Sequence, residues 1–166
     1  MLFPLGQKEE GAALLDLAVR IDPNLAFAWA SHAASRLALG DPQAAIGDLE
    51  RALRLSPLDY YSKAYALTLM VRALNLSGAP DKALPFATEA LRLRPKFPWA
   101  HIDAVVAHVL SGHLDQARRM LGEYRQSPLL AKTYASISEV RTVRGAISEA
   151  GLKIYVEALR KAGLPE

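Results

Sequence analysis

A recurring phrase that ends in proline restricts the fold of this sequence more than any other feature. The phrases AVRIDP, ALRLSP and ALRLRP end at Pro23, Pro57 and Pro95, and a looser fourth unit ends at Pro128. The successive intervals between these prolines are 34, 38 and 33 residues. A period of about 34 residues is typical of stacked helical hairpins. We therefore expect an all-α array, an architecture that offers a binding surface and has no built-in chemistry.

The composition allows a folded core and excludes several classes of protein. The 166 residues are 51% hydrophobic and contain no cysteine, so disulfides, thiol nucleophiles and Cys-ligated zinc are excluded. The lack of cysteine fits a reducing compartment, and we expect a cytoplasmic protein. The net charge of +3 is spread along the chain, so we expect no nucleic-acid partner. We expect no membrane association, because the sequence has no uncharged apolar run of about 18 residues.

Glycine and proline predict where the helices of each hairpin begin and end. Gly40 suits the left-handed conformation that follows a helix, and Asp41 with Pro42 suits the start of the next one. Gly78 and Pro80 repeat this arrangement in the second unit. One face of each second helix has the spacing of a packing surface: Ala45, Leu49 and Ala52, then Ala83, Ala87 and Ala90.

Two irregularities of the second unit each lead to an expectation about its helices. The interval of 38 residues before Pro95 predicts a first helix about one turn longer in the second unit. Pro85 lies inside the second helix of that unit and cannot donate a backbone hydrogen bond, so we expect a local distortion in a helix that survives. A third hairpin is expected from about Pro98 to Pro128, with its turn at Gly112.

These positions resemble the tetratricopeptide repeat over roughly residues 9–128. The first unit matches that family's pattern at Trp29, Gly40, Ala45, Leu49, Ala52 and Pro57. The second matches at Gly78, Ala83, Ala90 and Pro95, and the third at Gly112 and Ala117. The resemblance implies a right-handed superhelical array of helical hairpins, with the first helix of each hairpin lining a concave surface.

The sequence divides into three parts on this basis. Residues 23–128 hold about three hairpins, and residues 129–166 form a C-terminal helical cap. Residues 1–22 fit the second helix of a partial repeat, with Gly6 at the turn position and leucines on an open face: Leu14, Leu15 and Leu17. This helix either packs as an N-terminal cap or marks a truncated piece of a longer array. We favour truncation, because terminal repeats need a polar outer face.

The C-terminal part departs from the repeat. A short helix is expected from near Ser136, and a longer one follows Ser148 or Gly151 and ends at Gly163. The phrases ALRLSPLD and LRKAGLPE resemble the repeat region of bacterial, rhizobial-type adenylate or guanylate cyclases and related winged-helix regulators. That resemblance implies an accessory module of a signalling protein without the catalytic domain, since nothing here matches the catalytic residues.

The concave surface is the expected binding site for a protein or peptide partner. Mapping the family's inner-face positions gives a mainly apolar groove, suited to an amphipathic helix. Alternatively, the C-terminal helix over residues 152–162 folds back and fills this groove. The candidate residues are Phe27, Leu37, Tyr65, Thr68, Arg72, Asn75, Trp99, Ile102 and Val106.

No catalytic, cofactor-binding or metal-binding set is expected. The spacing of His101 and His108 separates them by two helical turns, about 10 Å, which is too far for one metal ion. Phosphate-binding glycine motifs and a serine nucleophile elbow are also missing. We therefore expect a non-catalytic protein–protein interaction module. The alternative is an oligomerisation or regulatory unit that self-associates through the open N-terminal face.

Overall fold

The computed structural model describes residues 8–55, 59–128, 130, 132–142 and 147–166. Gly6 and Pro57, for which the sequence predicts turn and helix-ending roles, lie outside the described residues. The described part consists of helices joined by short connections. The helices are α1 (Lys8–Ile21), α2 (Ala26–Leu39), α3 (Pro42–Leu55), α4 (Tyr60–Leu76), α5 (Pro80–Leu93), α6 (Pro98–Leu110), α7 (Leu114–Gln126), α8 (Ile137–Thr142) and α9 (Glu149–Ala162).

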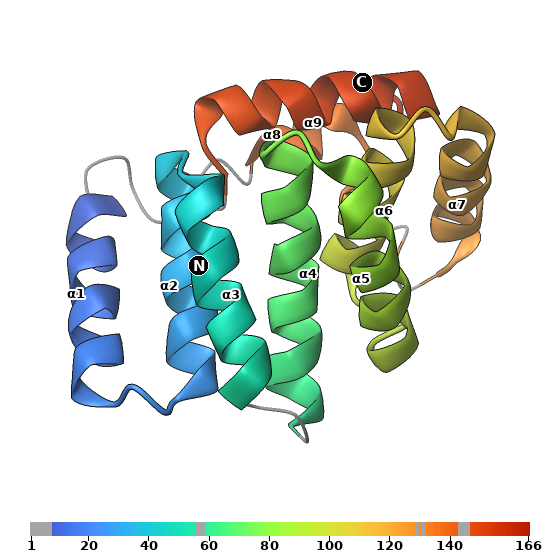
Figure 1. Cartoon of the computed structure of the whole chain (residues 1–166). Helices are drawn as coiled ribbons and strands as arrows, with labels where there is room; N and C mark the ends of the chain where they lie inside the picture. Colours follow the sequence, from blue (N-terminus) through green and yellow to red (C-terminus); the bar gives the residue numbers. More distant parts are fainter. Residues whose placement is uncertain (1–7, 56–58, 129, 131, 143–146) are drawn as a thin grey trace.

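Helices α2 to α7 form three antiparallel hairpins stacked side by side (Figure 1). The first helices of the hairpins, α2, α4 and α6, pack against one another in one layer. The second helices, α3, α5 and α7, form the other layer, and α1 packs on α2 at the edge of the array. The all-α repeat fold predicted from the proline period is confirmed.

The predicted turn chemistry is present where the first hairpin reverses. Gly40 has φ +88°, and its N–H points to the carbonyls of Arg36 and Leu37 at the end of α2. The Asp41 side chain then accepts a hydrogen bond of 3.0 Å from the N–H of Ala44, which caps α3. Both features satisfy backbone groups that a helix end leaves unpaired. The glycine and aspartate therefore fix the turn that sets the two helices antiparallel.

Small side chains let the two layers approach closely. The alanines expected on the packing faces of α3, α5 and α7 are buried, as are their neighbours on α2 and α4. Since alanine projects little beyond the backbone, the helices come close while the larger side chains fill the space between turns. The buried alanines include Ala45, Ala52, Ala83, Ala87, Ala90 and Ala117.

The longer first helix of the second unit and the survival of its second helix around Pro85 are confirmed, while the local distortion at Pro85 stays a prediction. Helix α4 has 17 residues, against 14 in α2, which accounts for the longer proline interval. Helix α5 runs unbroken from Pro80 to Leu93 with Pro85 inside it. Pro85 is exposed and lies in the second turn, where the helix tolerates the missing backbone donor.

The C-terminal segment closes one end of the array. Helix α9 packs on α6 and α7, and its N-terminal end reaches the ends of α2 and α4 (Figure 1). Its N-terminus is held by Ser148, whose N–H donates to the carbonyl of Leu37 at 3.2 Å and whose side chain accepts from Gly151. Leu76 at the end of α4 packs beside Gly151. This arrangement places the last helix of the chain over residues of the concave layer.

Candidate functional site

An aromatic side chain occupies the same place in each hairpin of the concave layer. Phe27, Tyr65 and Trp99 each precede the turn glycine of their hairpin by 13 residues. Since α2, α4 and α6 pack side by side, equal positions on these helices form a row across the layer. We call Phe27, Tyr65 and Trp99 the aromatic row. All three are among the candidate residues predicted from the sequence.

The row is open at one end and covered at the other. The rings of Phe27 and Tyr65 stack with centroids 5.7 Å apart at 28°, and Phe27 remains 48% exposed. Trp99 instead lies between the guanidinium of Arg72, 4.2 Å from its centroid, and the ring of Tyr134, at 4.6 Å. Tyr134 belongs to the C-terminal segment. Phe27 is therefore the most exposed ring of the row, whereas Tyr65 and Trp99 are both partly buried.

Tyr61 extends the open end by one helical turn. It lies four residues before Tyr65, on the same face of α4, and is 62% exposed. The guanidinium of Arg94 lies 4.5 Å from the centroid of its ring and 4.3 Å from that of Phe97. The open end thus presents aromatic faces with a cation beside them.

A buried ion pair supports the covered end of the row. Arg72 donates two hydrogen bonds to the carboxylate of Asp103, at 3.2 and 3.0 Å. The Tyr155 hydroxyl donates to the same carboxylate at 2.8 Å, and the Asn75 amide donates to the Asp103 carbonyl at 3.0 Å. These side chains come from α4, α6 and α9 and are buried. The network joins the C-terminal helix to the concave layer.

Burial and ion pairing shift the pKa of each titratable member of this network. Burial raises the pKa of Asp103, against the attraction and hydrogen bonds of Arg72. Burial opposes the charge of Arg72, but Asp103 outweighs this effect and raises the pKa of the guanidinium. Burial also raises the pKa of Tyr155 well above its usual value. Removing one partner of such a buried pair generally costs about 3–5 kcal/mol, because the other charge is left unpaired.

The other six candidate residues are buried in this structure. Ile102 and Val106 pack in one core cluster with Ile137, Tyr155 and Leu159 of the C-terminal segment. Thr68 donates to the carbonyl of Ala64 within its own helix. The structure therefore brings the nine candidates to one layer and divides them between an open part and a part covered by the chain itself. The buried six are Leu37, Thr68, Arg72, Asn75, Ile102 and Val106.

Sequence reasoning missed Asp103, Tyr134 and Tyr155, which shape the covered end. Asp103 carried a usable signal, since it is an acidic residue inside an otherwise apolar helix, next to an inner-face position. Tyr134 and Tyr155 lie in the segment that does not repeat, so repeat offsets could not assign them to a face. Among the described residues, no cluster of three or more metal-ligating side chains occurs.

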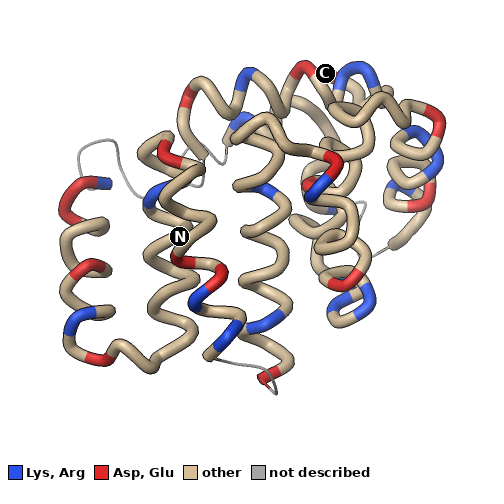
Figure 2. Tube along the Cα trace, viewed as in Figure 1, with Lys and Arg blue, Asp and Glu red and all other residues tan. Residues whose placement is uncertain are grey.

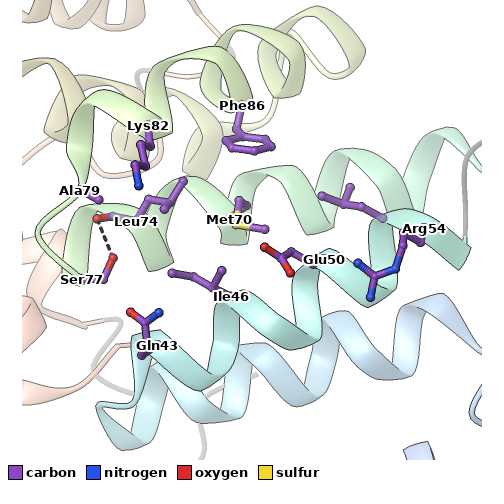
Figure 3. Close-up of a pocket in the computed structure, with 11 residues that line it drawn as sticks. Gln43, Ile46, Glu50, Arg54, Met70, Leu74, Ser77, Ala79, Lys82 and Phe86 are labelled. Atoms are coloured by element: carbon purple, nitrogen blue, oxygen red, sulfur yellow. Dashed lines mark hydrogen bonds between the residues drawn. The ribbon is translucent and has the colours of Figure 1, made fainter.

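A cavity of about 510 Å³ opens on the opposite layer, between α3 and α5 (Figure 3). Helix α4 forms its floor. Apolar side chains line the cavity, with polar ones among them: Gln43, Ile46, Glu50, Leu53, Arg54, Met70, Leu74, Ser77, Ala79, Lys82 and Phe86. We call this site the α3–α5 groove. Its volume lies in the range of about 300–1,000 Å³ that is usual for ligand pockets.

Helix α1 presents apolar side chains to solvent at the edge of the array. Leu14 is 63% exposed and Ile21 is 74% exposed, while Val19 on the other side of the helix is buried against the array. Leu17 and Leu25 are also exposed. We call Leu14, Leu17, Ile21 and Leu25 the α1 face. The partial exposure of leucines that the sequence predicted here is confirmed for Leu14 and Leu17.

Comparison with known proteins agrees with this geometry. Residues 74–128, from the end of α4 to just beyond α7, match the model of the tetratricopeptide repeat family. Among solved structures, the chain is similar to YrrB, described as a tetratricopeptide repeat (TPR) protein with an unusual peptide-binding site. The TM-score is 0.57 and the identity 19%, covering 94% of this chain and 76% of YrrB. The fold is that of a TPR array. No curated protein matches the sequence.

The TPR fold accounts for the division between the two layers. In the described hairpins the first helices form the layer with the aromatic row, and the second helices form the layer with the α3–α5 groove. None of the described helices is long and apolar enough to cross a membrane.

Proposed function

We propose that this TPR array is a non-catalytic module that binds a peptide segment of a partner protein at the open end of the aromatic row. The observation that carries this proposal is the half-exposed Phe27 stacked on the partly buried Tyr65, with the exposed Tyr61 one turn away. Aromatic side chains bury a large area at a small cost in side-chain entropy, and they dominate binding hot spots. An exposed apolar patch of this kind is typical of interaction sites.

The chemistry of the surface favours an amphipathic helix as the bound segment. The open end offers ring faces for apolar side chains, and Arg94 offers a cation to an acidic group at the margin of the segment. Helices bind such grooves through apolar residues spaced three and four apart. YrrB, the TPR protein of similar fold, has a peptide-binding site, which supports a peptide ligand here.

The test is a selection of helical peptides from a random library, followed by calorimetric measurement of the Kd. We expect Phe27→Ala combined with Tyr65→Ala to weaken the selected peptides by at least tenfold, about 1.4 kcal/mol. The control is Tyr60→Ala, which removes a 61% exposed tyrosine of α4 that lies outside the aromatic row. Unchanged binding by the double variant would contradict the proposal.

The cellular setting is a finer part of the same proposal. We propose that the module is the accessory repeat region of a cyclase-type signalling protein in the cytoplasm. This rests on the resemblance of ALRLSPLD and LRKAGLPE to the repeat regions of such proteins. The reading frame around the coding sequence provides the test: an in-frame cyclase or winged-helix domain is the expected finding, and a frame without one would contradict it.

A second candidate function is self-association through the α1 face. The observation that favours it is the row of exposed apolar side chains at Leu14, Leu17 and Ile21 on one side of the helix. Light scattering tests this candidate, because Leu14→Glu combined with Leu17→Glu should convert an oligomer to a monomer. A wild-type chain that is already monomeric at high concentration would rule it out.

A further inference from the structure

We propose that the α1 face of one copy of this chain docks into the α3–α5 groove of a second copy. This inference deepens the second candidate function, on which it rests, by naming the surface that receives α1. The contact joins two different surfaces, so it is heterologous, and repeated contacts of this type produce open chains or closed rings.

The α3–α5 groove has the shape of a helix-binding site. Helices α3 and α5 both pack on α4, and the cavity of about 510 Å³ lies between them (Figure 3). Ile46, Met70 and Phe86 come from three different helices and give the groove an apolar lining. Methionine adapts its shape to irregular partners more readily than branched side chains do. A helix laid between α3 and α5 would bury its apolar side against this lining.

The charged side chains at the rim of the groove have no ion-pair partner within the described part of the chain. Lys82 lies in the first turn of α5, whereas Glu50 and Arg54 lie in the last two turns of α3 (Figure 3). The order along the groove is therefore positive, negative, positive. Surface charges left unpaired around an apolar site give a partner's orientation and register rather than stability.

The charges of α1 have the complementary order. After Lys8, three acidic residues (Glu9, Glu10 and Asp16) precede Arg20 in the last turn, and Asp22 lies just beyond the end of the helix, which gives negative, positive, negative (Figure 2). Within the described part of the chain Arg20 is paired only with Asp16, at 2.9 Å, in an exposed contact that solvent weakens. With α1 parallel to α3, Arg20 lies near Glu50, and Glu10 extends toward Lys82.

The spacing of the groups favours this parallel orientation. Arg20 and Asp22 are close together near one end of α1, as Glu50 and Arg54 are near the end of α3. Glu10 and Arg20 are separated by about 15 Å along the helix axis. When Arg20 lies near Glu50, the long Lys82 side chain can extend along the groove toward Glu10. In this register Leu14, Leu17 and Ile21 lie over the apolar part of the groove.

Pairing of two α1 faces with each other is the simpler alternative, and the area involved disfavours it. The face offers only four exposed apolar side chains, three of them on the convex surface of α1. A stable interface usually buries about 800 Å² on each partner. A groove with two walls and a floor surrounds the helix and buries more of it than a second convex helix does.

The experiment is a mixing test by light scattering on the full chain. One variant carries Leu14→Glu and Leu17→Glu, which disables the α1 face and leaves the groove intact. The other carries Ile46→Glu, which disables the groove and leaves the α1 face intact. We expect wild-type chain to associate as concentration rises toward about 1 mM, where even weak contacts populate. Each variant alone should be a monomer, and an equimolar mixture should form a one-to-one dimer.

The other outcomes separate this inference from the self-association on which it rests. An oligomer that is abolished by the α1 substitutions but unchanged by Ile46→Glu would keep self-association and overturn the groove as its acceptor. A mixture that stays monomeric would also overturn the groove. A wild-type chain that is monomeric throughout would overturn both.

Two further variants guard against simple loss of folding. Thr88→Glu places the same charge at an exposed position of α5 that does not line the groove, and should associate like wild type. Arg20→Glu should weaken association by at least tenfold, and Glu50→Arg in the same chain should restore it. Failure of the second change to restore association would overturn the proposed register.

Discussion

Single residues decide how the concave layer is divided. The carboxylate of Asp103 lies inside the core and is stabilised by groups from two other helices, Arg72 on α4 and Tyr155 on α9. A buried ion pair contributes little net stability, but it penalises every arrangement that separates the charges. The network therefore specifies where α9 lies on the array, and in doing so it selects which end of the aromatic row stays open.

At the same scale, Tyr124 makes the stability of the C-terminal part depend on alkaline pH. Burial, with smaller contributions from Tyr134 and Glu139, raises the pKa of Tyr124 to about 12 from its usual value of 10. The hydroxyl donates to the carbonyl of Thr133, a contact that ionisation removes. Because the folded state holds this proton more tightly, its contribution is fully present below pH 10 and is lost as the pH rises toward about 12.

Urea unfolding of wild type and Tyr124→Phe measures this contribution. The free energy of unfolding of wild type should fall more steeply with pH above about 10 than that of Tyr124→Phe. The variant lacks the Tyr124 hydroxyl, so only its other buried tyrosines contribute to the slope. Equal slopes for the two proteins would show that Tyr124 does not titrate as the structure implies. Near pH 7 the variant should be slightly less stable, since one hydrogen bond is lost.

At the scale of elements, replacing a glycine by alanine should have opposite effects on stability in two helices. A Cβ at Gly151 in α9 would lie 2.9 Å from Ile147 and 3.0 Å from Leu76, whereas one at Gly47 in α3 would meet nothing within 4 Å. Gly151→Ala should therefore lower the free energy of unfolding by about 1–3 kcal/mol through overpacking. Gly47→Ala should raise it by up to about 1 kcal/mol through helix propensity. Urea denaturation of both variants checks the pair, and stabilisation by Gly151→Ala would contradict the close seating of α9.

The sequence predicts the repeating helices well because their signals are local. Gly40, Asp41 and the buried alanines each act within a turn or across one hairpin, so spacing alone identifies them. The same offsets predict that Phe27, Tyr65 and Trp99 share a layer. Spacing cannot show that Tyr134 covers Trp99, because that contact joins residues from parts of the chain with different patterns.

The long-range polar contacts could not be predicted from the sequence for the same reason. Arg72 and Asp103 are 31 residues apart and Asn75 and Tyr155 are 80 apart, so no periodic pattern relates them. Exposure of the α1 face could be predicted, since the amphipathic pattern of a single helix suffices. The α3–α5 groove could not, because its existence depends on how far apart two helices lie on a third.

At the scale of the whole molecule, the chain fills part of its own concave surface. Six of the nine candidate residues are buried, and Phe27 on α2 is the most exposed member of the aromatic row. The central claim is therefore that α9 is seated across the ends of the first helices. Both proposed surfaces, the open end of the row and the α3–α5 groove, lie outside the area that α9 covers.

Disulfide trapping tests this seating directly, because the natural chain has no cysteine. A Cβ on Gly40 would lie 3.4 Å from that of Ser148, close to the range of about 3.5–4.5 Å that a disulfide requires. Gly78 has the same left-handed turn conformation, with φ +78°, but no atom within 4 Å of its Cβ position, so it provides a matched control. Mild oxidation should cross-link Gly40→Cys with Ser148→Cys and leave Gly78→Cys with Ser148→Cys as free thiols. Free thiols in the first pair, or equal cross-linking in both, would contradict the position of α9 and with it the division of the concave surface.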